Sequence, residues 1–111
     1  MKAIKTDIDG VVIVEPEVFG DNRGYFFESF SEKEFSAKVR EVKFVQDNES
    51  KSRFGVLRGL HFQKAPHAQS KLTRVIKGAV LDVAVDMLDY MLPAGKIVYT
   101  EDKDGNVTKS I

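Results

Sequence analysis

The sequence contains no cysteine, no excess of either charge and no long hydrophobic run. The absence of cysteine excludes disulfide scaffolds, thiol nucleophiles and zinc sites built from thiolates. Lys plus Arg and Asp plus Glu both number 17, so the net charge is zero, whereas nucleic-acid binders and polybasic membrane proteins carry a positive excess. No stretch reaches the roughly 18 apolar residues of a membrane span, and residues 1–10 lack the apolar core of a signal peptide. We therefore expect a soluble cytoplasmic protein without nucleic-acid or membrane partners.

The length of 111 residues fits a single domain over 1–111. Hydrophobic residues make up 42% and aromatic residues 10% of the chain, which is enough for a packed core and excludes intrinsic disorder and collagen-like structure. Short β-branched and aromatic runs, separated by turn residues, predict many strands. The expected strands are 11–14, 25–30, 55–63, 72–76, 79–87, 97–100 and 106–111, with 42–52 extended.

Two hairpin turns and one helix start organise this pattern. Lys77-Gly78 separates two alternating runs, and Asp104-Gly105 is the strongest short hairpin signal of the chain. Ser31 and Glu34 match a capping box, which predicts one short helix that ends near Val39. About seven short strands with one small helix are typical of an antiparallel sandwich or barrel.

One polar segment, 46–52, places four uncharged side chains on the same face if it is extended, because side chains alternate along a strand. That face is neutral and rich in hydrogen-bond donors and acceptors, so it fits a ligand-binding face. It fits a solvated edge strand equally well. The four residues are Gln46, Asn48, Ser50 and Ser52.

Arg58, His61 and Gln63 interrupt an otherwise apolar run. On a regular strand Arg58 would face away from His61 and Gln63, so a shared site requires a bulge or sharp bend at Gly59. His61 fits a hydrogen-bonded structural role as well as a catalytic one. The second histidine of the chain, His67, follows at a spacing that does not let one strand or one helix present both imidazoles to a metal ion.

A third polar segment places Gln69, Lys71 and Thr73 on one face. A diphosphate needs positive charge and fixed donors. In a chain of zero net charge, however, cations are equally explained as scattered surface charge. The cations that could together hold a diphosphate are Arg23, Arg58, Lys71 and Arg74.

Taken in order, these segments resemble the dTDP-4-dehydrorhamnose 3,5-epimerase family, the dTDP-sugar isomerases with a cupin jelly roll. Five ordered motifs over about residues 1–86 carry the resemblance. The motifs are Asp21-x-Arg23-Gly24-x-Phe26-x-Glu28, Gln46-x-Asn48-x-Ser50-x-Ser52, Gly55-Val56-x-Arg58-Gly59-Leu60-His61-x-Gln63, Ala68-Gln69-x-Lys71-Leu72 and Gly78-x-Val80-x-Asp82-Val83-Ala84-Val85-Asp86.

The resemblance implies an isomerase of dTDP-rhamnose biosynthesis, a branch of carbohydrate metabolism. Its substrate is a thymidine-diphosphate-linked 4-keto-6-deoxyhexose, whose C4 ketone acidifies the protons at C3 and C5. The resemblance assigns the base to His61, since imidazole titrates near neutrality, and places Lys71 beside the C4 oxygen, where its charge would stabilise the enolate. It implies no metal and no organic cofactor.

The resemblance also implies the substrate-binding residues and a homodimer. Arg58 and Gln46 would contact the diphosphate, and the neighbouring subunit would supply part of the nucleotide site. The fold would be an antiparallel, cupin-like jelly roll, abridged in this chain and carrying one short helix. The remaining substrate-binding positions are Arg23, Phe26 and Glu28 at the nucleotide, together with Asn48 and Gln63.

The tail at 87–111 is largely unmatched by these motifs. The family's Pro-x-Gly-Phe-x-His-Gly-Phe segment is absent, and neither its general-acid tyrosine nor the aspartate that orients the catalytic histidine is matched. Tyr90 and Tyr99 are the tyrosines that the tail offers as substitutes. Two alternatives to an epimerase therefore stay open: a non-catalytic nucleotide-sugar-binding module that has lost the general acid, and a structural β-domain.

Overall fold

The computed structural model describes residues 1–87, 98–101 and 107–110. Its fold class is mainly β with antiparallel pairing and one short helix, as the sequence predicts for an abridged cupin-like fold. The chain divides into two compact units, unit 1 with 1–41 and 74–111 and unit 2 with 42–73. The single cupin-like domain expected from the sequence stays a prediction.

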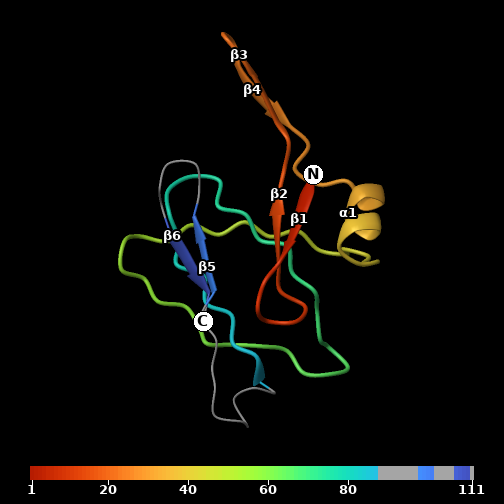
Figure 1. Ribbon diagram of the computed structural model, residues 1–111. Helices are drawn as coiled ribbons and strands as arrows, with labels where there is room; N and C mark the ends of the chain where they lie inside the picture. The colour runs from red at the N-terminus through yellow and green to blue at the C-terminus, as the bar shows by residue number, and fades with distance from the viewer. Residues whose placement is uncertain (88–97, 102–106, 111) are drawn as a thin grey trace. The chain divides into compact units, whose positions relative to one another are not determined.

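In the described part of the chain, three two-stranded antiparallel sheets hold the strands, all of them in unit 1 (Figure 1). Four of the expected strands are confirmed, at Val12–Glu15, Gly24–Phe27, Val98–Glu101 and Val107–Ser110, although the strand expected at 25–30 ends at Phe27. The pairing of the last two strands confirms the expected last hairpin. The turn Asp104-Gly105 lies outside the described residues. The pairs are β1 (Lys2–Lys5) with β2 (Val12–Glu15), β3 (Val18–Asp21) with β4 (Gly24–Phe27), and β5 (Val98–Glu101) with β6 (Val107–Ser110).

The side chain of Thr6 shapes the connection between β1 and β2. Its Oγ1 donates to the carbonyl oxygen of Val11 at 2.8 Å and accepts the N–H of Ile8 at 3.2 Å. Gly10 supplies the positive φ of 81° at which this turn closes. These bonds leave Ile8 with an exposed fraction of 6%, so that the turn contributes a buried apolar side chain to unit 1.

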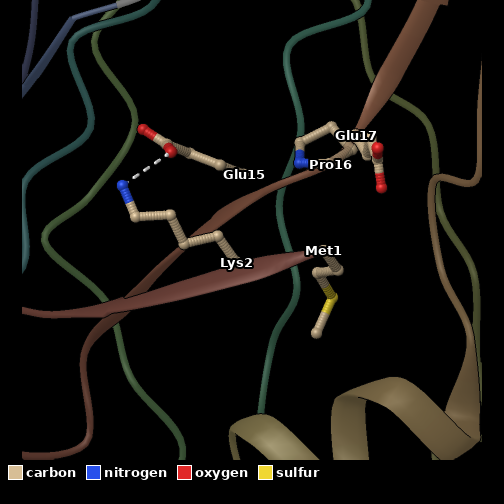
Figure 2. Close-up of a pocket in the computed structure, with 5 residues that line it drawn as sticks. All are labelled: Met1, Lys2, Glu15, Pro16 and Glu17. Carbon is tan, nitrogen blue, oxygen red and sulfur yellow. Dashed lines mark ion pairs between the residues drawn. The ribbon is translucent and has the colours of Figure 1, made fainter.

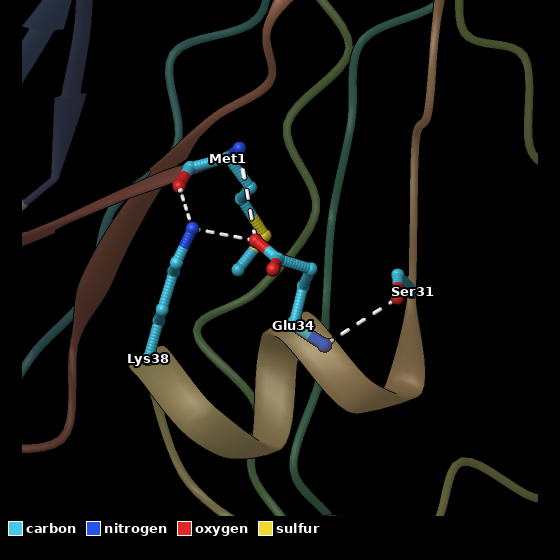
Figure 3. A network of polar contacts seen from close by, with 4 residues as sticks. All are labelled: Met1, Ser31, Glu34 and Lys38. Carbon is cyan, nitrogen blue, oxygen red and sulfur yellow. Dashed lines mark hydrogen bonds and ion pairs between the residues drawn. The ribbon is translucent and has the colours of Figure 1, made fainter.

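Helix α1 (Glu32–Lys38) begins and ends where the sequence predicts. The Ser31 Oγ accepts the N–H of Glu34 at 3.4 Å, so Ser31 is the N-cap and Glu34 occupies the third helical position. The carboxylate of Glu34 contacts Lys38 at 2.5 Å and the Met1 amino group at 3.9 Å (Figure 3). The ammonium of Lys38 also donates to the carbonyl oxygen of Met1 at 2.8 Å, which ties α1 to the beginning of β1.

Phe35 is the buried side chain of α1, with an exposed fraction of 7%, and its ring lies 5.7 Å from that of Phe30. In the described residues, Ile8 and Phe35 are the two buried hydrophobic side chains. Both belong to unit 1. Unit 2 has most of its apolar side chains exposed, among them Val45, Phe54, Leu57, Leu60 and Phe62.

Three strand predictions are wrong. Gly55–Gln63, Leu72–Ile76 and Ala79–Met87 form no strand within the part of the chain that the structure describes, and Lys77-Gly78 is a bend without a hairpin. Alternation gives a segment two faces, but a strand also needs a neighbour that accepts and donates its backbone hydrogen bonds. No such ladder joins these residues to another described segment. Conversely, the sequence analysis missed β1 and β3.

Phe35→Ala should lower the free energy of unfolding by about 3–5 kcal/mol, because the change removes a buried ring and leaves a cavity beside Phe30. Phe54, whose ring is fully exposed, is the matched control, and Phe54→Ala should change the stability by about 0.5 kcal/mol or less. Urea unfolding followed by circular dichroism measures both. Equal midpoints for the two variants would contradict the burial of Phe35.

Candidate functional site

The nine positions implied by the family resemblance are distributed over both units, and all nine residues are exposed. An exposed side chain can contact a ligand. Because it is not packed in a core, only its local hydrogen bonds and ion pairs fix its orientation. Unit 1 contains Arg23, Phe26 and Glu28, and unit 2 contains Gln46, Asn48, Arg58, His61, Gln63 and Lys71.

Arg23 lies in the turn between β3 and β4, where it forms an ion pair with Asp21. Its Nη2 lies 2.5 Å from Asp21 Oδ2 and its Nε 3.1 Å from the same oxygen, while the backbone N–H of Arg23 donates to Asp21 Oδ1 at 2.8 Å. The side-chain and backbone hydrogen bonds from Arg23 lower the pKa of Asp21 below 3.8, and the bond to Asp21 raises the pKa of Arg23. The guanidinium therefore already has a carboxylate partner.

Strand β4 has aromatic side chains on both of its faces. Phe26 pairs in register with Phe19 of β3 and is 70% exposed. On the opposite face the rings of Tyr25 and Phe27 stack with their centroids 5.9 Å apart. The guanidinium carbon of Arg74 lies 5.4 Å from the centre of the Phe27 ring, a cation–π distance. Arg74, one of the four cations considered for a diphosphate, is thus engaged by an aromatic ring.

Gln46 and Asn48 of unit 2 are joined by their side-chain amides. The Nε2 of Gln46 donates to Asn48 Oδ1 at 3.1 Å. The sequence analysis places these two residues on one face because they are two positions apart, and their contact confirms that they share it. The Gln46 carbonyl and the Asn48 amide nitrogen point to no other described partner, so the pair offers one acceptor and one donor group to a ligand.

Arg58 is held by two neutral groups of the same polar segment. Its Nε donates to Ser52 Oγ at 3.1 Å and its Nη2 to the carbonyl oxygen of Lys51 at 3.5 Å. Among the ion pairs of the described residues none includes Arg58. The guanidinium is therefore oriented while its positive charge has no carboxylate partner, which is the state in which it can bind a phosphate.

His61 lies two residues after Gly59, whose backbone conformation is unusual. Gly59 has a φ of 109°, a conformation that glycine adopts readily and other residues rarely do, and the Gly59–Leu60 peptide bond is cis. Within the described ranges, neither His61 nor Gln63 nor Lys71 forms a side-chain hydrogen bond or an ion pair. The side chains of these three residues are therefore open to a ligand.

The shallow hollow of about 280 Å³ beside β1 and β2 is a separate feature (Figure 2). Lys2 and Glu15 form an ion pair of 3.5 Å across it. None of the nine positions lines it; the lining residues are Met1, Lys2, Glu15, Pro16 and Glu17. In the described portion of the chain, no three His, Asp or Glu side chains are grouped as a metal site would require, and no helix is long and apolar enough to span a membrane.

Two contributions to these arrangements were missed by the sequence analysis. Asp21 belongs to the first motif, but its role as the partner of Arg23 was not predicted; an Asp two residues before an Arg at a hairpin turn is the signal for it. Ser52 was placed on a polar face, but its hydrogen bond to Arg58 was not predicted. The sequence pattern does not specify the backbone path that brings Arg58 close to Ser52.

The comparison with known proteins identifies the family. The dTDP-4-dehydrorhamnose 3,5-epimerase family matches residues 5–103, so the match extends into the tail that the motifs alone left largely unmatched. Proteins named dTDP-4-dehydrorhamnose 3,5-epimerase are 60% identical over 88 residues in Shigella flexneri, 60% over 84 in Methanothermobacter thermautotrophicus and 52% over 99 in Escherichia coli.

These alignments cover most of this chain and much less of the relatives. They include 78%, 76% and 88% of the chain but 49%, 45% and 54% of the respective relatives. The chain therefore spans about half the length of the curated relatives it matches. Because the family match covers nearly the whole sequence and the relatives are more than half identical to it, the chain belongs to the dTDP-4-dehydrorhamnose 3,5-epimerase family.

Proposed function

We propose that this chain binds a thymidine-diphosphate-linked 4-keto-6-deoxyhexose and removes protons from the carbons next to its ketone, as part of a 3,5-epimerase of dTDP-rhamnose biosynthesis. The observation that carries the proposal is the orientation of Arg58 by Ser52 and Lys51, without a carboxylate partner, inside the motif that runs from Gly55 to Gln63. A guanidinium in this state suits a diphosphate. A cytoplasmic location stays a prediction from the sequence.

The proposed reaction needs one base and one cation. His61, in its neutral form, takes the proton from C3 or C5, and the electron pair of that C–H bond moves toward the C4 oxygen to give an enolate. The ammonium of Lys71 stabilises the charge on that oxygen. The carbon then regains a proton, and inversion follows where this proton arrives on the opposite face.

The proposed ligand contacts include both charged and neutral side chains. Arg58 and the Gln46–Asn48 pair serve the diphosphate and its surroundings, with Gln63 as a further polar contact. Phe26 offers an exposed ring to the nucleotide. Arg23 and Glu28 complete the nucleotide contacts, and Arg23 does so with its Asp21 ion pair in place.

We also propose a homodimer. The β3–β4 sheet has two strands with exposed aromatic rings at Phe19, Tyr25 and Phe26, and Val80 and Leu81 are exposed by 54% and 60%. Exposed apolar side chains and free strand edges favour association. A second copy would cover them and could complete the nucleotide site.

Arg58→Ala should weaken the binding of thymidine diphosphate by tenfold or more. Charge-assisted hydrogen bonds to phosphate are worth about 1.5–3 kcal/mol, and roughly 1.4 kcal/mol corresponds to one decade in Kd. Isothermal calorimetry measures the change. Arg53→Ala is the matched control, since Arg53 lies in the same unit outside the motifs, and it should leave Kd unchanged; equal losses for both variants would contradict a specific role of Arg58.

His61→Ala should abolish the incorporation of solvent deuterium at C3 and C5 of dTDP-4-keto-6-deoxyglucose, because exchange requires a base at the substrate. His67→Ala, the matched control, should retain it. NMR or mass spectrometry of the recovered sugar measures the incorporation. We expect little net inversion, since a missing general acid costs about 10²–10⁴-fold and no tyrosine of this chain matches the family's acid by motif. Binding without any exchange would favour the non-catalytic module.

Light scattering at micromolar concentration should give twice the chain mass of 12.5 kDa, because the exposed rings of β3–β4 need cover. Phe19→Asp, which places a charge among those rings and lies outside the proposed site, should shift the mass toward that of one chain. Surface changes elsewhere, such as Lys64→Asp, should not. A wild-type mass of one chain would contradict the dimer.

A further inference from the structure

Among the glycines that the structure describes, Gly59 is set apart by the side chain that lies next to it. Five of these glycines have a positive φ, and at four of the five the space that a β-carbon would fill is open. At Gly59 a β-carbon in ideal geometry would lie 3.3 Å from His61 Nδ1, 3.5 Å from the His61 backbone nitrogen and 3.9 Å from His61 Cε1. The four with open space are Gly10, Gly24, Gly55 and Gly78.

The closest of these approaches concerns the imidazole itself. A separation of 3.3 Å is tighter than nine in ten real contacts of a β-carbon, so the ring would have to move by a few tenths of an ångström. The atoms within reach, Nδ1 and Cε1, form one edge of the ring. His61 is an exposed residue, so few other groups surround its ring. The 3.3 Å approach makes the backbone at position 59 one boundary of the space that the ring occupies.

We infer that Gly59 is a positioning residue for His61. Because Gly59 has no β-carbon, the Nδ1–Cε1 edge of the imidazole can lie close to the backbone at position 59, and an L side chain at that position displaces the ring. The catalytic meaning of this placement rests on the proposed function, in which His61 is the base. The placement itself rests on the geometry of unit 2 alone.

The chain contains two histidines, which makes the displacement directly measurable. The experiment compares the imidazole carbon and proton resonances of His61 and His67 in the full-length wild type, Gly59→Ala and Gly55→Ala, without ligand and at one pH. Gly55 has a φ of 80° and open space around it, so Gly55→Ala imposes a similar backbone strain without a contact to His61. We expect Gly59→Ala to shift the His61 resonances and leave those of His67 in place, and Gly55→Ala to shift neither.

Two results would overturn the inference: unchanged His61 resonances in Gly59→Ala, or an equal shift of His61 in Gly55→Ala, which would assign the effect to backbone strain. If Gly59→Ala does not fold, Gly59→Ala combined with His61→Ala is compared with His61→Ala alone. Folding of the double variant supports the contact with the ring, and its failure to fold overturns it. The resonances are recorded without substrate, so they test the placement of His61 alone. A failure of the proposed function would appear separately, as absent deuterium exchange in the wild type.

Discussion

The ring of Phe35, buried against Phe30, holds α1 in unit 1. With seven residues, α1 is far below the roughly 12–15 residues at which an isolated helix becomes marginal in water. Its N-cap at Ser31 and the contacts of Glu34 and Lys38 with Met1 add local stabilisation and orient the helix on β1. Those polar contacts are exposed or only part-buried and are individually weak, so they depend on the burial of Phe35 for their geometry.

The four cations that the sequence offers for a diphosphate have different immediate partners. These partners decide how far each positive charge is available to an anion. Arg23 is neutralised by Asp21, and Arg74 lies over the Phe27 ring. Arg58 is oriented by a hydroxyl and a carbonyl, which fix the guanidinium without cancelling its charge. Lys71 has no such partner among the described residues. Sequence proximity to a motif therefore does not by itself make a cation available to an anion; its immediate partner decides.

The local signal for the helix predicted its structure well, whereas the local turn signal Lys77-Gly78 did not give a hairpin. Ser31 and Glu34 specified the start of α1 because an N-cap is satisfied within a few residues. Gly55–Gln63 was wrong as a strand because its pattern describes one segment, whereas a strand depends on a neighbour that the pattern cannot name. β1 was missed since Lys2 and Lys5 enclose only two apolar residues, too few to show alternation.

The sequence proposes the residues of the candidate site, and these stay predictions, but it does not predict their contacts. The motifs single out Arg58 and His61, while the bond from Arg58 to Ser52 and the approach of Gly59 to His61 depend on backbone geometry that no spacing encodes. Gln46 and Asn48 are the exception, since a period of two was sufficient to bring their amides together.

The Asp21–Arg23 ion pair has a consequence for how a ligand first meets the protein. Two opposite charges in contact act at a distance as a dipole, whose field falls off faster than that of a single charge, and salt at about 0.1 M screens even single charges beyond roughly 10 Å. The β3–β4 turn therefore contributes little to the long-range attraction of a dianion. Under the proposed function, Arg58 and Lys71 of unit 2 are the site cations without a carboxylate partner among the described residues. Removing either one should therefore change the ionic-strength dependence of the association rate more than removing Arg23.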